Sequence, residues 1–193
     1  MPLLQKIEEN NCQIAIWEIR ESLKQLIPLS NNIDISRFKH ENRKKEFISS
    51  RLLLNELLPN TDISYNKYGA PEIKKDYFIS ISHSRDLIAI IISKRKVGID
   101  IEKISKKPLD LSSRFISKEN YLNITEEKAT LIWCCKEAIF KWHQKGSIDF
   151  IADITISPFI VKEKGKILAK FKNQEHTLHY TKIDDHFLVY VCK

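Results

Sequence analysis

The spacing of hydrophobic residues along this chain predicts the same order of strands and helices twice. In the first half, Cys12 to Ile19 alternates along the chain with β-branched side chains, which is typical of a strand. Two stretches with helical spacing follow, and then two short β-rich runs that we expect to form a hairpin. The helical stretches are Glu21–Ile27 and Ser36–Leu58, with Ser36 as the expected N-cap and Pro59 as the stop, and the β-rich runs are Tyr77–Ser82 and Leu87–Ser93.

The second half repeats this order. Val97 to Glu102 is predicted to be a strand and residues 108–145 to be helices interrupted by loops. Four more strands are expected, at Ile151–Ile156, Lys166–Phe171, His176–Ile183 and His186–Cys192. Because a strand, helices and a meander occur twice, we predict an α+β fold of two similar α/β halves. The halves are residues 1–96 and 97–193, packed as one body since no low-complexity linker separates them.

The composition limits the kind of protein. The chain has 193 residues, 42% of them hydrophobic and 30% charged, so it is long enough to bury a core and too apolar for a disordered chain. Its four glycines, at 69, 98, 146 and 165, are too scattered for the phosphate loops G-x-G-x-x-G and G-x-x-x-x-G-K-[ST]. Any bound phosphate must therefore be held by side chains or by a metal ion.

The net charge of +7 favours an anionic partner. The excess is spread over both halves, apart from a basic run at residues 37–51 that is either a solvated helix face or a binding surface. The cysteines at 12, 134, 135 and 192 form no C-x-x-C pair, which indicates reduced thiols and a cytoplasmic protein. We expect no membrane association, because the N-terminus lacks a signal-peptide pattern and the longest aliphatic run, Leu87 to Ile92, is too short for a span.

Two carboxylates stand two residues apart in the predicted strand at Val97–Glu102. Because successive side chains of a strand point to opposite faces, Asp100 and Glu102 are expected to share one face, opposite their isoleucine neighbours. Two like charges held so close repel each other unless a cation lies between them or one carboxyl stays protonated. The pair is therefore either a metal site, where oxygen ligands favour Mg²⁺ or Ca²⁺, or an ordinary exposed strand face.

Residues 133–141 carry a second group of charges. On a helix, Trp133, Glu137 and Lys141 stand four residues apart and share one face. This spacing fits a simple Glu137–Lys141 ion pair, and it also fits a site in which Glu137 is a third metal carboxylate and Lys141 contacts a phosphate oxygen. Upstream, Ser82 and His83 are neighbours on a strand and point to opposite faces, which excludes a catalytic Ser-His dyad and leaves His83 as a candidate phosphate contact.

Five segments, taken in order, share their pattern with one family. They are Tyr68-Gly69-Ala70-Pro71 (Y-G-K-P in the family), residues 78–84 (F-N-I-S-H-S), residues 97–102 ((V/I)-G-(I/V)-D-x-E), residues 114–119 (R-F-F-S-x-x-E) and residues 133–141 (W-x-x-K-E-x-x-x-K). In these segments the chain resembles the 4′-phosphopantetheinyl transferases, of the larger type first described in surfactin synthesis. The third and fifth motifs are the specific ones. Ala70 departs from the usual lysine, so a cation is missing there.

The resemblance implies a monomer with pseudo-twofold symmetry that binds coenzyme A in the cleft between its halves. It implies that Asp100, Glu102 and Glu137 hold Mg²⁺ on the pyrophosphate, and that Glu137 and Lys141 are the catalytic residues. It assigns coenzyme A to Arg43, Arg51, Ser82, His83 and Lys141, with the 3′-phosphate at His83 and the two arginines.

The implied reaction moves 4′-phosphopantetheine from coenzyme A to a serine of an apo carrier protein and releases 3′,5′-ADP. Glu137 would accept the serine proton, directly or through a water. Carrier proteins are usually acidic around that serine, so a basic enzyme would favour their encounter. Two other classes stay open: a metal-dependent nuclease, and a non-catalytic nucleic-acid-binding protein that uses residues 37–51. The transferase interpretation includes no nucleic-acid partner.

Overall fold

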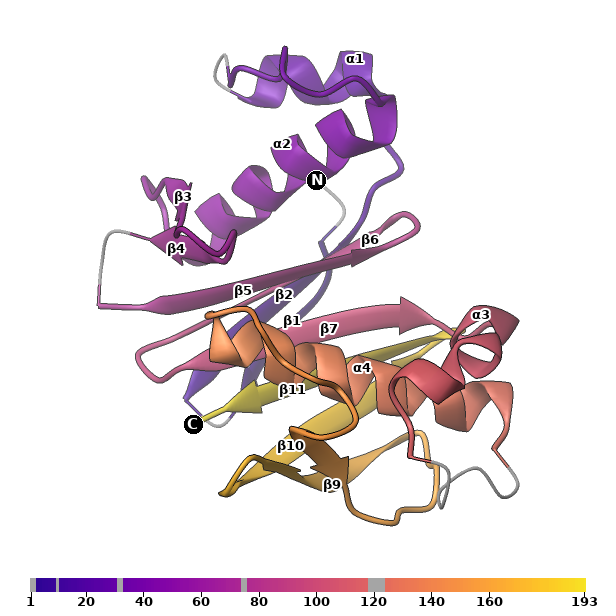
Figure 1. Ribbon diagram of the computed structural model, residues 1–193. Helices are drawn as coiled ribbons and strands as arrows, with labels where there is room; N and C mark the ends of the chain where they lie inside the picture. Colours follow the sequence, from indigo (N-terminus) through magenta and orange to yellow (C-terminus); the bar gives the residue numbers. More distant parts are fainter. Residues whose placement is uncertain (1–2, 10, 31–32, 74–75, 118–123) are drawn as a thin grey trace.

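Two antiparallel sheets form the framework of the molecule (Figure 1). The computed structural model describes residues 3–9, 11–30, 33–73, 76–117 and 124–193. The first sheet has the order β1-β2-β6-β5, with β1 at Leu3–Glu9, β2 at Cys12–Glu18, β5 at Phe78–Ser84 and β6 at Leu87–Ser93. The second has the order β7-β11-β10-β9-β8, with β7 at Val97–Lys103, β8 at Ile154–Ile156, β9 at Lys164–Phe171, β10 at Gln174–Ile183 and β11 at His186–Cys192.

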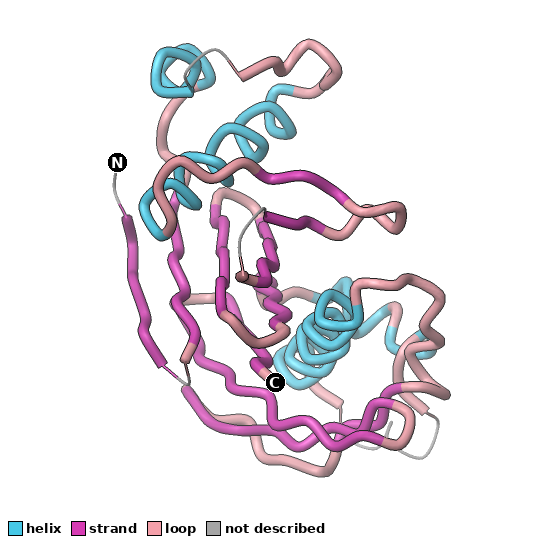
Figure 2. The backbone as a smooth tube through the Cα atoms, turned by 90° about the vertical axis from the view of Figure 1, so that its left-hand side faces the viewer, coloured by secondary structure: helices cyan, strands magenta, loops and turns pink. Residues whose placement is uncertain are grey.

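Each sheet is covered by a long helix of its own half. Helix α2 (Glu41–Leu57) packs on the first sheet through a core that includes Leu53, Leu54 and Ile90. Helix α4 (Glu126–His143) packs on the second sheet, which curves around it in Figure 2. The shorter helical pieces are α1 (Leu23–Leu26), α3 (Lys106–Asp110) and 3-10 turns at Ile27–Ser30 and Ser112–Arg114. Among the described helices, none has the length and apolar character needed to cross a lipid bilayer.

The sheet faces turned away from the helices meet in a third core. Ile14 and Ile91 of the first sheet pack there with Ile99, Ile101 and Leu188 of the second. This confirms the alternation predicted for β7, because the isoleucines enter the core between the sheets and the carboxylates alternating with them face α4.

The same connection order occurs in both halves. Strand β2 precedes α1 and α2 and pairs with β6, the last strand of its half, just as β7 precedes α3 and α4 and pairs with β11. The predicted α+β class is confirmed. The division at residues 96 and 97 and the pseudo-twofold relation stay proposals, which this repeated order supports.

Three serines of β5 join the two sheets. The hydroxyls of Ser80, Ser82 and Ser84 accept hydrogen bonds from the backbone N–H groups of residues 99, 101 and 103, at 3.1, 3.2 and 3.0 Å. These N–H groups lie on the edge of β7 that has no strand partner, so serine side chains satisfy them where a neighbouring strand otherwise would. The alternating serines of residues 80–84 thereby fix β5 beside β7.

Most predicted elements are confirmed, and the main error is the start of α2. Ser36 is not its N-cap, because its backbone N–H donates to Asp34 Oδ1 in a local turn, and the helix begins at Glu41 with His40 in the cap position. Strand β1 and the hairpin of β3 (Ile63–Tyr65) and β4 (Pro71–Ile73) were not predicted. Strand β8 starts at Ile154, three residues later than expected. The end of the predicted motif at 114–119 and part of the predicted helical region lie outside the described residues, at 118–123.

Candidate functional site

Strand β7 and helix α4 carry the charged residues that the sequence singles out, and they pack directly on each other at Gly98. A Cβ on Gly98 would lie 2.0 Å from the Ala138 carbonyl oxygen and 2.6 Å from the Trp142 backbone nitrogen. Because no side chain fits there, the backbone of α4 rests on β7. This contact brings the inward face of the helix onto Asp100 and Glu102.

Asp100 and Lys141 form a buried ion pair. Lys141 Nζ lies 2.6 Å from Asp100 Oδ1 and donates to Ser82 Oγ at 2.8 Å, while the Ser82 hydroxyl donates to the same carboxylate oxygen at 2.7 Å. Burial opposes the charge on Lys141, but the adjacent Asp100 carboxylate outweighs it and raises the pKa of Lys141 above its usual value. The Asp100 side chain is 3% exposed and that of Lys141 25% exposed, so the lysine connects a buried carboxylate to the surface.

Glu102 and Glu137 complete a group of three carboxylates. Burial, followed by the charge of Asp100, raises the pKa of Glu102 to about 7 and the pKa of Glu137 to about 7. The Trp133 indole N–H donates to Glu102 Oε1 at 3.1 Å, which orients that carboxylate toward α4. The charge of Asp100 thus disfavours ionisation of both glutamates, and a cation bound near them would favour it.

The donor set fits a divalent ion bound by oxygen. Asp100 Oδ2 is buried and has no hydrogen-bond partner among the described residues, and carboxylate oxygens are the ligands that Mg²⁺ prefers. As the side chains stand, no three His, Cys, Asp or Glu residues of the described chain are gathered closely enough to hold a metal. Binding at Asp100 Oδ2 therefore requires Glu102 or Glu137 to turn toward it.

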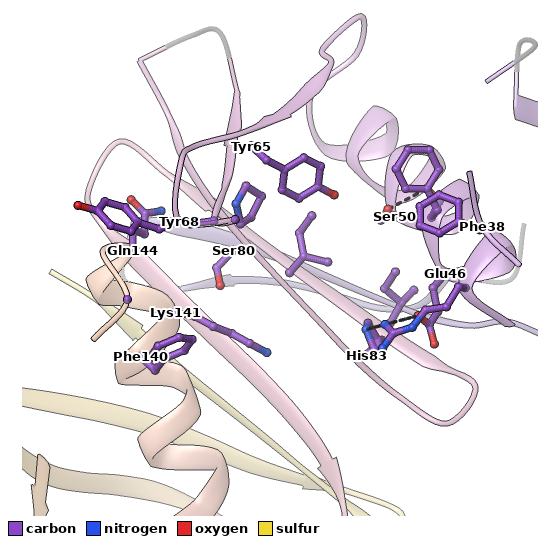
Figure 3. Close-up of a pocket in the computed structure, with 18 of the residues that line it drawn as sticks. Phe38, Glu46, Ser50, Tyr65, Tyr68, Ser80, His83, Phe140, Lys141 and Gln144 are labelled. Atoms are coloured by element: carbon purple, nitrogen blue, oxygen red, sulfur yellow. Dashed lines mark hydrogen bonds and ion pairs between the residues drawn. The ribbon is translucent and has the colours of Figure 1, made fainter. Parts of the chain in front are cut away.

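A cavity of about 430 Å³ opens beside this group (Figure 3). Lys141 extends into it from α4 on one side, and His83 and Glu46 lie on the other. There, Arg43 Nη1 lies 3.0 Å from His83 Nε2 and 3.0 Å from Glu46 Oε2. Burial lowers the pKa of His83 although Glu46 opposes this, so a neutral His83 ring accepts the Arg43 hydrogen bond. The cavity thus has a cationic group on each side.

Comparison with known proteins settles the family. The sequence profile of the 4′-phosphopantetheinyl transferase superfamily matches residues 96–192. The chain belongs to this superfamily. The 4′-phosphopantetheinyl transferase gsp of Aneurinibacillus migulanus is 30% identical over 111 residues, which is 52% of this chain and 47% of that protein. The psf-1 protein of Bacillus pumilus is 24% identical over 160 residues, and the alignment covers 74% of this chain and 67% of that protein. Sfp of Bacillus subtilis (strain 168) is 31% identical over 100 residues, and the alignment covers 46% of this chain and 45% of that protein. The chain thus spans about half the length of gsp and of Sfp.

Ser82 and Arg51, which the sequence assigns to coenzyme A, do not line the cavity. The Ser82 hydroxyl is engaged by Asp100, Lys141 and the β7 backbone. The Arg51 guanidinium stacks on Phe47, 3.3 Å from the ring centroid, and donates to the Phe47 carbonyl oxygen at 3.0 Å. Arg43, His83 and Lys141 do line the cavity. Arg51 and Ser82 do not line the cavity themselves but contact Phe47 and Lys141, which do.

Sequence reasoning missed the aromatic wall of the cavity in this superfamily member. The wall is made by Phe38, Phe47, Tyr65, Tyr68 and Phe140. Phe38 and Phe47, whose ring centroids are 4.8 Å apart, both lie in Ser36–Leu58, where their helical spacing predicts only a helix. Arg37 lies over the Phe47 ring at 4.6 Å and lines the same cavity. A basic run interleaved with phenylalanines was the available signal, since arginine stacks on aromatic rings.

The turn at residues 66–70 closes the cavity on the side of α4. Asn66 Oδ1 accepts hydrogen bonds from the backbone N–H groups of Tyr68 and Ala70 at 2.9 and 3.0 Å, and Gly69 takes a φ of +81° that favours glycine. Asn66 also donates to the Gln144 carbonyl oxygen at 3.2 Å, which links the turn to the end of α4. Ala70 lines the cavity with a methyl group in place of a cation.

Proposed function

We propose that this chain transfers 4′-phosphopantetheine from coenzyme A to a serine of an apo acyl or peptidyl carrier protein, releasing 3′,5′-ADP. The observation that carries the proposal is the cavity between two cationic groups, with the buried carboxylate of Asp100 and the half-buried carboxylates of Glu102 and Glu137 near Lys141. A ligand with phosphates at two separated points suits this arrangement, and coenzyme A has a pyrophosphate and a 3′-phosphate. The family of the chain supports the same reaction.

We assign Asp100, Glu102 and Glu137 to the Mg²⁺ that accompanies the pyrophosphate. Bound there, Mg²⁺ would neutralise charge on the phosphate oxygens. Lys141, with its pKa raised, is a fixed positive charge beside the same oxygens. Without cationic charge, these three carboxylates would repel the substrate.

Glu137 is the proposed general base. Burial raises its pKa to about 7 in the metal-free site, and the nearby Mg²⁺ would lower this value and keep the carboxylate ionised and able to accept a proton. In the proposal it accepts the proton of the carrier serine, directly or through a water, as the hydroxyl oxygen attacks the β-phosphorus.

Arg43 and His83 are proposed to hold the 3′-phosphate, and the aromatic wall to hold the adenine. Arg43 and His83 lie side by side on the cavity wall, so a phosphate that displaces the hydrogen bond between them would meet the guanidinium and, with a proton on Nε2, the His83 ring. Arg51 supports this side by fixing Phe47. The net charge of +7 favours encounter with an acidic carrier, and we propose that the chain acts as a cytoplasmic monomer.

The test is incubation with apo carrier proteins, coenzyme A and Mg²⁺. Intact-protein mass spectrometry of the carrier should show the gain of one phosphopantetheine group, with one equivalent of 3′,5′-ADP released. An unchanged carrier mass across acyl and peptidyl carriers, with DNA cleavage or salt-sensitive DNA binding in parallel assays, would favour the nuclease or nucleic-acid-binding alternatives.

A further inference from the structure

Two thiols meet where the two sheets adjoin, outside the cavity. Cys12 of β2 stands directly opposite Ser93 of β6 in the antiparallel ladder. Cys192 of β11 places its Sγ 3.5 Å from Ser93 Oγ, and the Cys12 thiol, which donates to the Glu9 carbonyl oxygen at 2.8 Å, packs in the same core as Cys192. Both residues are thiols. The sequence positions of the pair are far apart, and only the packing of β11 beside the first sheet brings them together.

This end of β11 is held by the first sheet on one side of Cys192 and by the connection between β6 and β7 on the other. The Tyr190 hydroxyl donates to Glu9 Oε2 at 3.1 Å, and the Lys193 backbone N–H donates to the Lys96 carbonyl oxygen at 2.9 Å. Cys12 and Cys192 therefore both lie beside Ser93 in the folded state.

The two thiols differ in reactivity. Cys12 is 3% exposed, and its neighbour Cys192 together with burial raises its pKa. The adjacent Cys12 side chain lowers the pKa of the partly exposed Cys192 to about 6, with Ser93 and Arg95 acting in the same direction. Cys192 is then a thiolate at neutral pH while Cys12 keeps its proton, which is the arrangement of an attacking and a resolving thiol.

We propose that Cys192 is a site of thiol–disulfide exchange with small disulfides such as glutathione disulfide, and that Cys12 resolves the product into a Cys12–Cys192 disulfide. The Cys192 thiolate attacks one sulfur of glutathione disulfide, forms a mixed disulfide and releases one glutathione thiolate. Cys12 then gives its proton to solvent, attacks the Cys192 sulfur and expels the second glutathione. The two cysteines lose two electrons, and one glutathione disulfide is reduced to two glutathione molecules.

Cys134 and Cys135 provide an internal control. Both are fully buried in α4, and burial raises the pKa of each thiol. The folded protein should leave them unmodified.

The experiment treats the folded protein with glutathione disulfide, then denatures it in iodoacetamide and measures intact mass and tryptic peptides. We expect two of the four cysteines to be alkylated, no retained glutathione, and a cross-linked peptide pair that contains Cys12 and Cys192. The Cys12→Ser variant should retain one glutathione on Cys192, and Cys192→Ser should retain none. Cys12→Ala serves as a second variant if the serine lowers thermal stability.

Four alkylated cysteines in the treated protein would overturn the proposal, as would glutathione retained on Cys192 to the same extent with and without Cys12. Because the readout is mass and not transfer activity, the result is independent of the proposed transferase function.

Discussion

Arg43 and His83 are in contact on the side of the cavity opposite Lys141, and each offers a donor to a bound anion. Replacing either residue by Ala should weaken the binding of coenzyme A by ~10-fold or more, because hydrogen bonds to a charged group contribute about 1.5–3 kcal/mol. Dephospho-coenzyme A, which lacks the 3′-phosphate, should lose little affinity. Isothermal titration with both ligands measures the difference.

Arg51 supplies the matched control on the same helix. Its guanidinium is engaged by the ring and carbonyl oxygen of Phe47, so Arg51→Ala should disturb the aromatic wall and weaken both ligands alike. If the Arg43 and His83 variants lost affinity equally for coenzyme A and dephospho-coenzyme A, the assignment of these residues to the 3′-phosphate would be wrong.

His176 of β10 makes the folded protein sensitive to acid. Both of its ring nitrogens are buried without a hydrogen-bond partner among the described residues, and the ring packs edge-on against Trp142 at 4.5 Å. Burial lowers its pKa to about 4, whereas an unfolded chain binds the proton near pH 6.5. Below that pH the unfolded state takes up a proton that the folded state does not, so stability falls as the pH drops from about 6.5 to about 4.

Between pH 7 and pH 4.5, the free energy of unfolding should therefore fall less for His176→Phe than for the parent. The difference between the two falls should be on the order of 2 kcal/mol. Urea unfolding at the two pH values measures this. Parallel pH curves for His176→Phe and the parent would contradict the assignment.

At the scale of the elements, β7 and α4 pack too closely at Gly98 for a side chain to fit between them. Gly98→Ala would place a methyl group against the helix backbone at Ala138 and Trp142, which cannot move without shifting the whole helix. We expect a loss of more than about 3 kcal/mol in the free energy of unfolding by urea, a cost in the upper range for overpacking. Gly165→Ala is the control, because its Cβ would meet only the Tyr180 side chain at 3.0 Å, and it should cost about 1 kcal/mol. Similar costs for the two would contradict the close-packed account.

The serines of β5 make a second prediction at this scale. Ser80→Ala removes the acceptor of the buried Ile99 N–H and should lower the free energy of unfolding by about 1–3 kcal/mol, the cost of an unsatisfied buried donor. Ser64→Ala, on the exposed strand β3, should change it by less than about 0.5 kcal/mol. Urea unfolding of the two variants checks this, and a neutral Ser80→Ala would show that the hydroxyl is dispensable for joining the sheets.

Local patterns were sufficient for most elements and failed where tertiary contacts decide. The alternating residues of β7 and the apolar face of α4 are visible in sequence because each has one buried face. The start of α2 was misplaced because Asp34, two residues upstream, binds the Ser36 N–H outside any helix. The hairpin of β3 and β4 has three-residue strands, too short for a periodic signal.

At the scale of the whole molecule, the proposed site needs both halves. The three carboxylates and Lys141 come from β7 and α4, while Arg43, Glu46 and His83 come from α2 and β5. The residues with a fixed spacing on one element were predictable from sequence. The aromatic wall was not, because it is assembled from α2, the β3–β4 hairpin and α4, which only the packing of the halves brings around one cavity.

The central claim is that Asp100, Glu102 and Glu137, the three carboxylates of β7 and α4, form the active site that transfers phosphopantetheine. The most direct measurement is the initial rate of apo-carrier modification, followed by intact mass, for Glu137→Gln and for Glu126→Gln at the exposed start of the same helix. The account predicts a fall of ~100-fold or more for Glu137→Gln, as is usual for a lost catalytic base, parent-like rates for Glu126→Gln, and no transfer in excess EDTA. A parent-like rate for Glu137→Gln, or full turnover in excess EDTA, would contradict it.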